Sequence, residues 1–541
     1  MATEQKSYSC LDDSDISAAD NYINLQDNIC YCLGDATMRT KTPSFILEMP
    51  LRTTPLHEST ILVRLDAGRQ LYNACLGESL KRLILMRQSK EYQEVIKLPK
   101  TIDGEPNKIR RDRFNQLNLK HGFREYDIYH YVATLRQSWL REHINIHIAQ
   151  AIASRAFRAA QKKAFWVAKN VRFKGKNQFD SLEGKNNETG LIFRNNVLFW
   201  SGLEIPCIVD EDNELISYGL KHRVKYCRLV RRKPNDKNRF YVQLILEGTP
   251  HQNLSHKVGT EEIGLDVGVG TIAIVGDTKA ELKQFCAELV PKQKEKRRLQ
   301  RKQDRQRRAN NPDNYNKNGT VKKGKRKWNN SNHYVKTSND LAEAERKLVA
   351  HRKSLHGKDI NEIIAMGTRI KTEAVSYKAW QKRFGKSIQV RAPSMFMSRL
   401  KIKAENAGGC LEEFATQTTK LSQTCHICGE AKKKPLSQRW HICCGIVMQR
   451  DLYSGFLAKC VDVPTNSLDI VRAKELWQGL EPVLSEAVSR ARQTAIGGRN
   501  PASFGFDRIL SQSGSLVKLI ETITEAVDDV ILMDESRREV I

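Results

Sequence analysis

Three carboxylates in separate segments of this 541-residue chain are the residues best suited to catalysis. Asp266 follows an apolar run and precedes two glycines, a pattern that predicts a strand, a tight turn and a second strand. Glu373 ends the strand-like segment 368–373, and Asp451 lies at the start of an amphipathic helix. Carboxylates that converge from separate segments can hold two Mg²⁺ ions, one to activate an attacking water and one to stabilise a leaving 3′ oxygen.

The order of these carboxylates narrows the class of reaction. Asp–Glu–Asp suits phosphodiester hydrolysis by an RNase H-like nuclease, whereas a transposase of the Asp–Asp–Glu kind places its glutamate last. The glycine turn after Asp266 also occurs in actin-like ATPases. Those enzymes need a second glycine-rich phosphate loop, and the later sequence offers no convincing one.

A cysteine cluster near residue 430 has the spacing of a metal site. Cys425 and Cys428 form a CxxC knuckle, and a second pair, Cys443 and Cys444, follows about fifteen residues later. This pattern predicts a structural zinc ribbon, because two thiolates on one knuckle turn can reach the same tetrahedral ion. A standard ribbon has CxxC or CxC in its second half, but here the two cysteines are adjacent. We expect Cys444 to be the third ligand and either Cys443 or His441 to be the fourth.

The charge of the chain predicts a polyanionic partner. Its 90 Lys and Arg against 62 Asp and Glu give a net charge of +28, and the segment 291–328 alone has 16 basic and 3 acidic residues. Nucleic acid is the first expectation and an anionic membrane the second. No apolar run is long enough for a membrane span, and the polar first residues do not predict a secretory signal. Thirteen cysteines, an odd number, suit a reducing cytosol.

Apolar periodicity predicts the elements that position these residues. A strand near Phe45 is followed by helices over 58–86 and 126–171, and 190–248 form a small antiparallel sheet or barrel that pairs with the first strand. The segment 291–328 begins as a helix and becomes a loop. A basic and aromatic stretch in the second helical region suits either a nucleic-acid groove or a solvated helix face; its members are Arg155, Arg158, Lys162, Lys163, Phe165, Trp166, Lys169 and Phe173.

Both ends of the chain give weaker signals. Residues 1–42 are polar and predict a loosely ordered leader, in which Cys10, Cys30 and Cys32 match no zinc pattern. Beyond Cys460 the sequence predicts further helix, including Leu516, Ile520, Ile523, Val527 and Ile531 after a break at 497–501.

Taken together, these motifs resemble the TnpB family and its relatives, the type V CRISPR effector nucleases. The segment IGLDVGVGTIAIVGD resembles the first RuvC motif, and RIKTEAV resembles the second. The most specific part is LSQTCHICG with RWHICCGIVMQRDLYSGFLA, which resembles a zinc ribbon fused to the third motif. The resemblance covers roughly residues 44–462.

This resemblance implies an α+β multidomain protein with an RNase H-like (RuvC) nuclease domain. The expected parts are a flexible leader (1–43), a wedge-like β-barrel (44–64 and 180–255), a helical recognition domain (65–179), the RuvC-like domain (256–420 and 447–475, with basic helices 291–328), the zinc ribbon (421–446) and a partly disordered helical extension (476–541).

The resemblance also implies an RNA-guided DNA endonuclease of the prokaryotic cytosol that acts at the nucleoid. Its partners would be a guide RNA, target double-stranded DNA and the displaced single strand, and pairing by the guide would read the sequence. Asp266, Glu373 and Asp451 would bind Mg²⁺ and catalyse cleavage, while the cysteines would bind Zn²⁺. The sequence leaves monomer and dimer open.

Two other functions fit the sequence. One is a guide-dependent DNA-binding protein that does not cut, although all three candidate carboxylates are present. The other is a transposase-like or resolvase-like protein that binds DNA without RNA.

Overall fold

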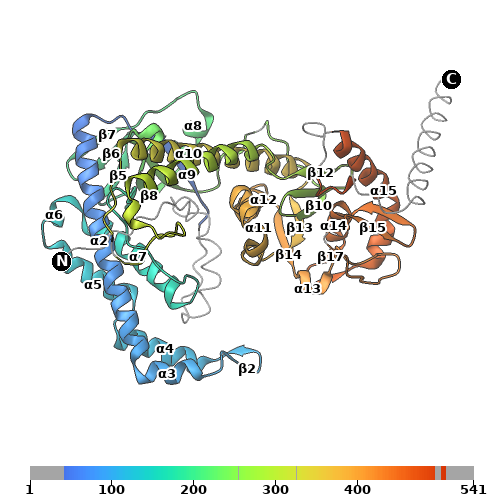
Figure 1. Cartoon of the computed structure of the whole chain (residues 1–541), viewed down its shortest axis with the longest axis horizontal. Coiled ribbons are helices and arrows are strands. Elements are labelled where there is room, and N and C mark those ends of the chain that lie inside the picture. The colour runs from blue at the N-terminus through green and yellow to red at the C-terminus, as the bar shows by residue number, and fades with distance from the viewer. Residues whose placement is uncertain (1–41, 254, 325, 436, 494–500, 507–541) are drawn as a thin grey trace. The chain divides into compact units, whose positions relative to one another are not determined.

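The computed structural model describes residues 42–506 apart from 254, 325, 436 and 494–500 (Figure 1). The described residues divide into two compact units, 42–252 with 307–343 and 253–306 with 344–506. Two predictions lie outside the described residues. They are the leader with its three cysteines, apart from the last two residues of the leader, and the helix around Leu516. Within the described part of the chain, no helix is both long and apolar enough to cross a membrane.

The second unit is built on a mixed five-stranded sheet with the order β12-β11-β10-β13-β14. Its strands are β10 (Glu262–Val267), β11 (Thr271–Val275), β12 (Ala280–Gln284), β13 (Arg369–Glu373) and β14 (Cys410–Phe414). The first three form an antiparallel meander, and β13 and β14 run parallel to β10. The predicted strand, turn and strand around Asp266 are therefore confirmed as β10 and β11.

Both faces of this sheet are buried at β11, which explains why this strand is apolar at almost every position. On β11, Ile272 and Ile274 belong to one core cluster, while Ala273 and Val275 belong to the cluster on the other face. Helices α10 (Asn332–Met366) and α12 (Pro393–Asn406) contribute to the first cluster, and α14 (Arg450–Lys459) and α15 (Ile470–Gln493) contribute to the second. The alternation follows from the two-residue period of a strand.

The remaining elements of this half of the sequence connect the sheet to its helices. They are α9 (Leu289–Asn310), η4 (Pro312–Asn314), α11 (Tyr377–Arg391), α13 (Thr416–Thr419), and the pairs β15 (Trp440–Cys443) with β16 (Ile446–Gln449) and β17 (Val461–Asp462) with β18 (Ser467–Leu468). Helix α9 confirms the predicted basic helix, and the described residues between η4 and α10, which form no helix or strand, confirm the predicted loop.

In the first unit the predicted pairing of the strand near Phe45 is confirmed, but the antiparallel strands make two sheets. One has the order β1-β9-β8-β4, with β1 (Ser44–Pro50), β4 (Ser181–Glu183), β8 (Val224–Arg232) and β9 (Arg239–Glu247). The other consists of β5 (Leu191–Arg194), β6 (Val197–Trp200) and β7 (Leu203–Pro206). A bridge between Leu51 and Cys207 joins them. Helix α8 (Glu214–Leu220) and η3 (Pro234–Asp236) fill two of the connections.

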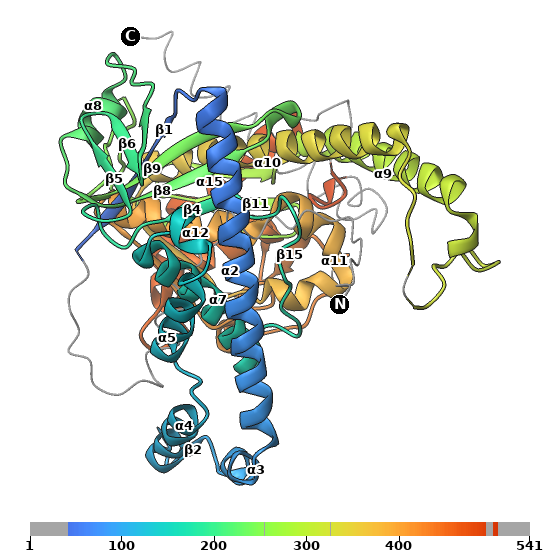
Figure 2. The same cartoon turned by 90° about the vertical axis from the view of Figure 1, so that its left-hand side faces the viewer.

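The long helix of the first unit is α2 (Pro55–Gln88), which packs against α7 (Ile146–Ala164) (Figure 2). Thr54 and Pro55 start α2 earlier than predicted, because the Thr54 hydroxyl caps the helix and proline suits its first turn. Near the C-terminal end of α2 lie α3 (Lys90–Lys97), α4 (Lys108–Lys120) and the short strands β2 (Thr101–Ile102) and β3 (Glu105–Pro106).

The helical stretch predicted over 126–171 is confirmed as far as Ala164, but it is divided into three helices and ends earlier than predicted. The chain forms α5 (Glu125–Arg136), α6 (Leu140–His143) and α7, and α7 ends at Ala164. Asn145 caps the N-terminus of α7 by accepting a hydrogen bond from the His147 N–H at 2.9 Å, which starts a new helix where periodicity alone suggested continuation. Residues 165–180 are consequently a loop rather than a basic helix face.

Candidate functional site

Strand β10 presents Asp266 on the face of the sheet that α14 covers. Its neighbours Ile263, Leu265 and Val267 all point into the opposite core cluster. Gly264 and Asp266 therefore face α14, which packs directly on β10. Asp266 itself is half-buried.

Two glycines set the distance between α14 and the sheet. A Cβ atom on Gly264 would lie 1.9 Å from the carbonyl oxygen of Gly455 in α14, and a Cβ on Gly455 would lie 3.0 Å from Val275 Cγ2. The helix backbone thus rests on the strand backbone with no side chain between them. Since Asp266 is two residues after Gly264 and Asp451 is one helical turn before Gly455, this crossing brings the two carboxylates to the same region.

Glu373 reaches the same region from the neighbouring parallel strand. Leu265 of β10 is paired with Thr372 of β13, so that the next residues on the two strands are Asp266 and Glu373. Glu373 is the last residue of β13, and it is half-buried. The parallel register therefore explains why the charge of Glu373 raises the pKa of Asp266, although the two residues are more than a hundred positions apart in sequence.

Asp451 is held in place by its own helix and by β11. The Gln449 side chain caps α14 by accepting from the Leu452 N–H at 2.9 Å, so Asp451 lies in the first turn. The Thr271 hydroxyl donates to Asp451 Oδ2 at 3.0 Å. Two guanidinium groups, those of Arg450 and Arg439, lie 3.9 and 4.0 Å from Asp451 Oδ1.

The electrostatics of this region link Asp266 to the other two carboxylates. Burial raises the pKa of Asp266 well above its usual range, and the negative charges of Asp451 and Glu373 raise it further. Burial raises the pKa of Glu373 to about 7, while the backbone N–H of Leu421 acts in the opposite direction. Carboxylates with such raised pKa values are suited to a bound cation, because its charge offsets the repulsion among them.

Sequence reasoning missed several residues that shape this site. Thr271 and the two glycines carry no charge, and their importance depends on contacts between distant segments. Tyr377, the first residue of α11, is half-buried, and the charges of Glu413 and Asp266 add to the burial that raises its pKa. A tyrosine placed after a strand gives no signal in sequence.

The four cysteines of the predicted ribbon lie together. Their sulfur atoms are all within 4.8 Å of one another, with Cys428 Sγ 3.8 Å and Cys444 Sγ 3.6 Å from Cys443 Sγ. A four-thiol set of this kind can hold a metal ion, and it matches the donor preference of structural zinc.

The adjacent pair Cys443 and Cys444 reaches one centre because of the turn between β15 and β16. Cys443 is paired with Ile446, which leaves Cys444 and Gly445 as a two-residue connection. Their φ angles are +51° and +80°, as in the tight hairpin turns that suit the twist of antiparallel strands. The left-handed conformation of Cys444 replaces the spacer residue that a standard ribbon has.

His441, the alternative zinc ligand, lies in a different environment. It is fully buried, and its ring stacks on Tyr453 with centroids 4.0 Å apart. Its Nδ1 atom is 2.5 Å from Lys434 Nζ. The histidine is not among the four residues that form the cluster in the described part of the chain.

The ribbon also supports the helix that carries Asp451. The Tyr453 hydroxyl contacts His426 Nδ1 at 2.7 Å and accepts from the His426 N–H at 3.1 Å. Arg450 donates to the carbonyls of Gln438 and Pro435 at 2.8 and 3.2 Å. The cysteine knuckle and the ribbon loop are therefore bonded to the first turn of α14, next to the third carboxylate.

Comparison with known protein families finds a match over the part of the chain that contains the four cysteines and the start of α14. Residues 394–455 match the family described as Cas12f1-like, TNB domain. The resemblance to the TnpB family and the type V effectors is confirmed. The matched TNB-like segment contains all four clustered cysteines and Asp451, whereas Asp266 and Glu373 lie outside it.

Solved structures give a more distant likeness. The chain is similar to the structure described as the Cas12f1–sgRNA–target DNA complex, with 11% identity, a TM-score of 0.41, and coverage of 76% of this chain and 98% of that chain. A second similar structure, described as a CRISPR–Cas12f ternary complex, has 13% identity, a TM-score of 0.25, and coverage of 83% and 95%. No curated protein sequence matches the chain.

We predict that Gly264→Ala destabilises the protein by about 2 kcal/mol or more, because the new methyl group and the Gly455 carbonyl cannot both fit and α14 must move. Chemical denaturation measures this loss of unfolding free energy. The matched control is Gly270→Ala, since a Cβ there meets nothing within 4 Å. Equal stability of the two variants would contradict the close packing of α14 on β10.

We predict that the purified protein holds one zinc ion per chain and that Cys425→Ser loses it, because one of four thiol ligands is removed. Elemental analysis of wild type and variant measures the metal content. His441→Ala is the control and should retain zinc, since His441 contacts Tyr453 and Lys434 instead. Loss of zinc in the histidine variant alone would reverse the ligand assignment.

We predict that Glu373→Gln stabilises the protein at pH 8 in magnesium-free buffer but not at pH 4.5. A carboxyl group whose pKa is raised to about 7 by folding binds its proton more tightly in the folded state, so stability falls as pH rises through the window from about 4.5 to 7. At pH 8 the ionised group costs up to about 3 kcal/mol, which glutamine avoids. Thermal unfolding across this pH range measures the difference, and parallel curves for the two proteins would refute it.

Proposed function

We propose that this chain is an RNA-guided DNA endonuclease that cuts DNA at a RuvC-type site. The observation that carries the proposal is the effect of Asp451 and Glu373 on Asp266, whose pKa both charges raise, with Asp451 inside the TNB-like segment. The mixed sheet that positions the first two carboxylates supports the RNase H-like fold expected for such a site. The motif order along the chain supports the same class of enzyme.

In this proposal Asp266, Glu373 and Asp451 hold Mg²⁺, and bound Mg²⁺ supplies Lewis-acid activation of water and stabilisation of the leaving 3′ oxygen. The residues of the chain keep the ligands in place. Thr271 fixes one oxygen of Asp451 through its hydroxyl hydrogen bond. The close contact between Gly264 and Gly455 keeps α14 on the sheet. Oxygen-only ligands suit Mg²⁺.

The cysteine cluster has a structural part in the proposal. Four thiols bind Zn²⁺ and leave no open coordination position, so the ion stabilises the ribbon and takes no part in hydrolysis. Because the ribbon is bonded to the first turn of α14, its folding secures the position of Asp451. We expect loss of zinc to reduce cleavage through this route.

The proposed partners are a guide RNA and target DNA with its displaced strand. The basic residues of α9 and the following loop supply phosphate contacts, since the segment 291–328 has a net charge of +13. Base pairing by the guide reads the target sequence, so the protein needs few contacts to bases. We assign the helical segment 65–179 to recognition and the antiparallel sheets around it to a wedge-like domain.

We predict that Asp451→Ala abolishes cleavage of a matched target while binding of guide and target stays within about twofold, because the change removes a metal ligand and, besides it, only a small buried side chain that accepts one hydrogen bond from Thr271. The protein is expressed with its native flanking DNA, the RNA that copurifies is sequenced, and cleavage is measured with Mg²⁺. Asp462→Ala, which removes an exposed carboxylate of β17, is the control and should cut normally.

Three outcomes separate the proposal from its alternatives. Normal cleavage by Asp451→Ala would refute the site. A wild type that binds matched DNA and never nicks it would identify a guide-dependent binding protein. Copurification of only random cellular RNA would favour a protein that acts on DNA without a guide.

A further inference from the structure

The loop that follows α7 exposes an unusual run of apolar side chains. Phe165, Trp166 and Val167 are 50%, 71% and 58% exposed, and Phe173 further along is 53% exposed. Three consecutive large apolar residues in water are unfavourable unless a ligand covers them. The run is thus the strongest unassigned surface feature of the first unit.

Trp166 is also held in a backbone conformation that does not suit it. Its φ angle is +60°, and its N–H donates to the Lys163 carbonyl at 3.3 Å just beyond the end of α7. This is the position where helices commonly have glycine, because a side chain with a Cβ is strained there. Strain at a bulky residue with an exposed side chain indicates a functional rather than a packing role.

Arg87 of α2 supports the tryptophan from one side. Its Nη2 atom donates to the carbonyls of Lys163 and Ala164, each at 3.1 Å, and its guanidinium carbon lies 4.5 Å from the centroid of the Trp166 ring. The arginine therefore completes the end of α7 and contacts one face of the indole. With 71% of the residue exposed, the rest of the ring is available to a ligand.

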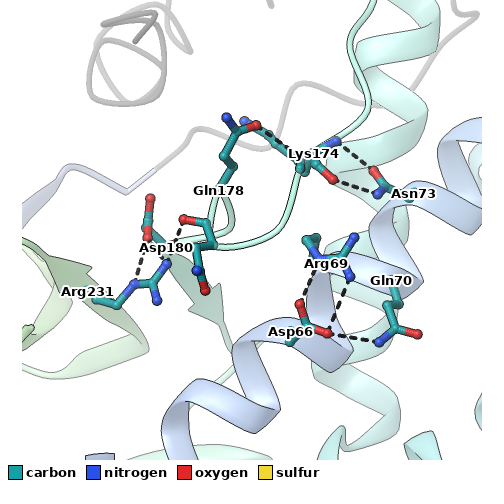
Figure 3. Close-up of polar contacts among 10 residues, drawn as sticks. Asp66, Arg69, Gln70, Asn73, Lys174, Gln178, Asp180 and Arg231 are labelled. Carbon is teal, nitrogen blue, oxygen red and sulfur yellow. Dashed lines mark hydrogen bonds and ion pairs between the residues drawn. The ribbon is translucent and has the colours of Figure 1, made fainter. Parts of the chain in front are cut away.

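The loop is fixed at its other end as well (Figure 3). The Asn73 side chain makes two hydrogen bonds of 2.8 Å with the backbone of Lys174, and Gln178 Oε1 accepts from the Gly175 N–H at 3.0 Å. Arg231 forms an ion pair with Asp180 and donates to the Asn177 carbonyl at 2.9 Å. The exposed rings thus belong to a braced loop, and little ordering entropy remains to be lost on binding.

The charge of the segment defines the chemistry of the ligand. Between residues 143 and 179 the chain has no Asp or Glu, and it has eight basic residues: Arg155, Arg158, Lys162, Lys163, Lys169, Arg172, Lys174 and Lys176. A flat ring on a segment with many basic and no acidic residues suits a polyanion with flat apolar groups. Nucleic acid has both features, phosphates and bases.

We infer that Trp166 is a stacking platform for a nucleobase, either unpaired or at the end of a duplex, with Arg87 bracing the indole from behind. This inference rests on the proposed function only in requiring that the chain binds nucleic acid. Trp166 is a binding residue, and it takes no part in hydrolysis.

The test uses the full-length protein with labelled single-stranded RNA and DNA of about 12 nucleotides, and with blunt duplexes of the same length. Trp166→Ala should weaken binding about tenfold, as expected for one lost base stack, while Trp166→Phe should stay within about threefold of wild type. The slope of affinity against salt should not change, because no phosphate contact is lost. A 2-aminopurine base in the strand should be quenched by wild type and not by Trp166→Ala.

Two further variants separate binding from folding. Trp166→Gly should bind as weakly as Trp166→Ala but unfold at a higher temperature than it, since glycine relieves the strain of the positive φ. Trp139→Ala, which removes another exposed tryptophan of the same unit, should bind like wild type.

Unchanged binding and quenching by Trp166→Ala would overturn the inference even if the wild type cuts guided targets. The tenfold loss in a protein that never cuts would support the inference and refute the nuclease proposal. A wild type that binds none of the probes would refute both. The probe with the larger loss identifies RNA, DNA or a duplex end as the source of the base.

Discussion

The close contact between the backbones of β10 and α14 is the constraint on which the candidate site depends. Gly264 leaves no room for a side chain, so the helix lies directly on the strand. A larger residue at this position would displace the first turn of α14 and, with it, Asp451. The glycine therefore does as much to define the site as the carboxylates do, although it has no chemical group of its own.

Holding three carboxylates together is costly in a folded protein, and the surrounding structure offsets this cost. Burial and mutual repulsion raise the pKa of Asp266, so the ionised site is unfavourable without a cation. Apolar cores on both faces of the sheet and the ribbon bonded to α14 hold these residues in place. A site that is unstable when empty favours binding of the ion that relieves it.

The first unit shows the same relation between stability and binding on its surface. The loop after α7 exposes large apolar rings and places Trp166 in a left-handed conformation, and both features cost free energy. Hydrogen bonds from Arg87, Asn73 and Arg231 keep the loop in this form. Rings held ready in a basic segment reduce the entropy lost when a partner binds.

Much of the fold and of the candidate site could be predicted from the sequence, because the relevant signals are local. Apolar periodicity identified α2, the glycine turn identified β10 and β11, the basic run identified α9, and the CxxC spacing identified the ribbon. Periodicity did not show that the helical stretch over 126–171 divides into three helices and ends at Ala164, since the Asn145 cap starts a new helix within the apolar pattern. Phe165 and Trp166, which expose their rings in the loop after α7, were consequently expected on a helix.

The sequence by itself determined which residues could take part in catalysis or binding: three carboxylates, four cysteines and an excess of basic side chains. Only the tertiary structure decided which of them meet. The parallel register of β10 with β13 places Glu373 beside Asp266, and the φ angle of Cys444 lets adjacent cysteines reach one centre. Neither is visible in sequence. The register depends on backbone geometry between segments that are distant in the chain, and the φ angle of Cys444 is a torsion that residue type does not fix.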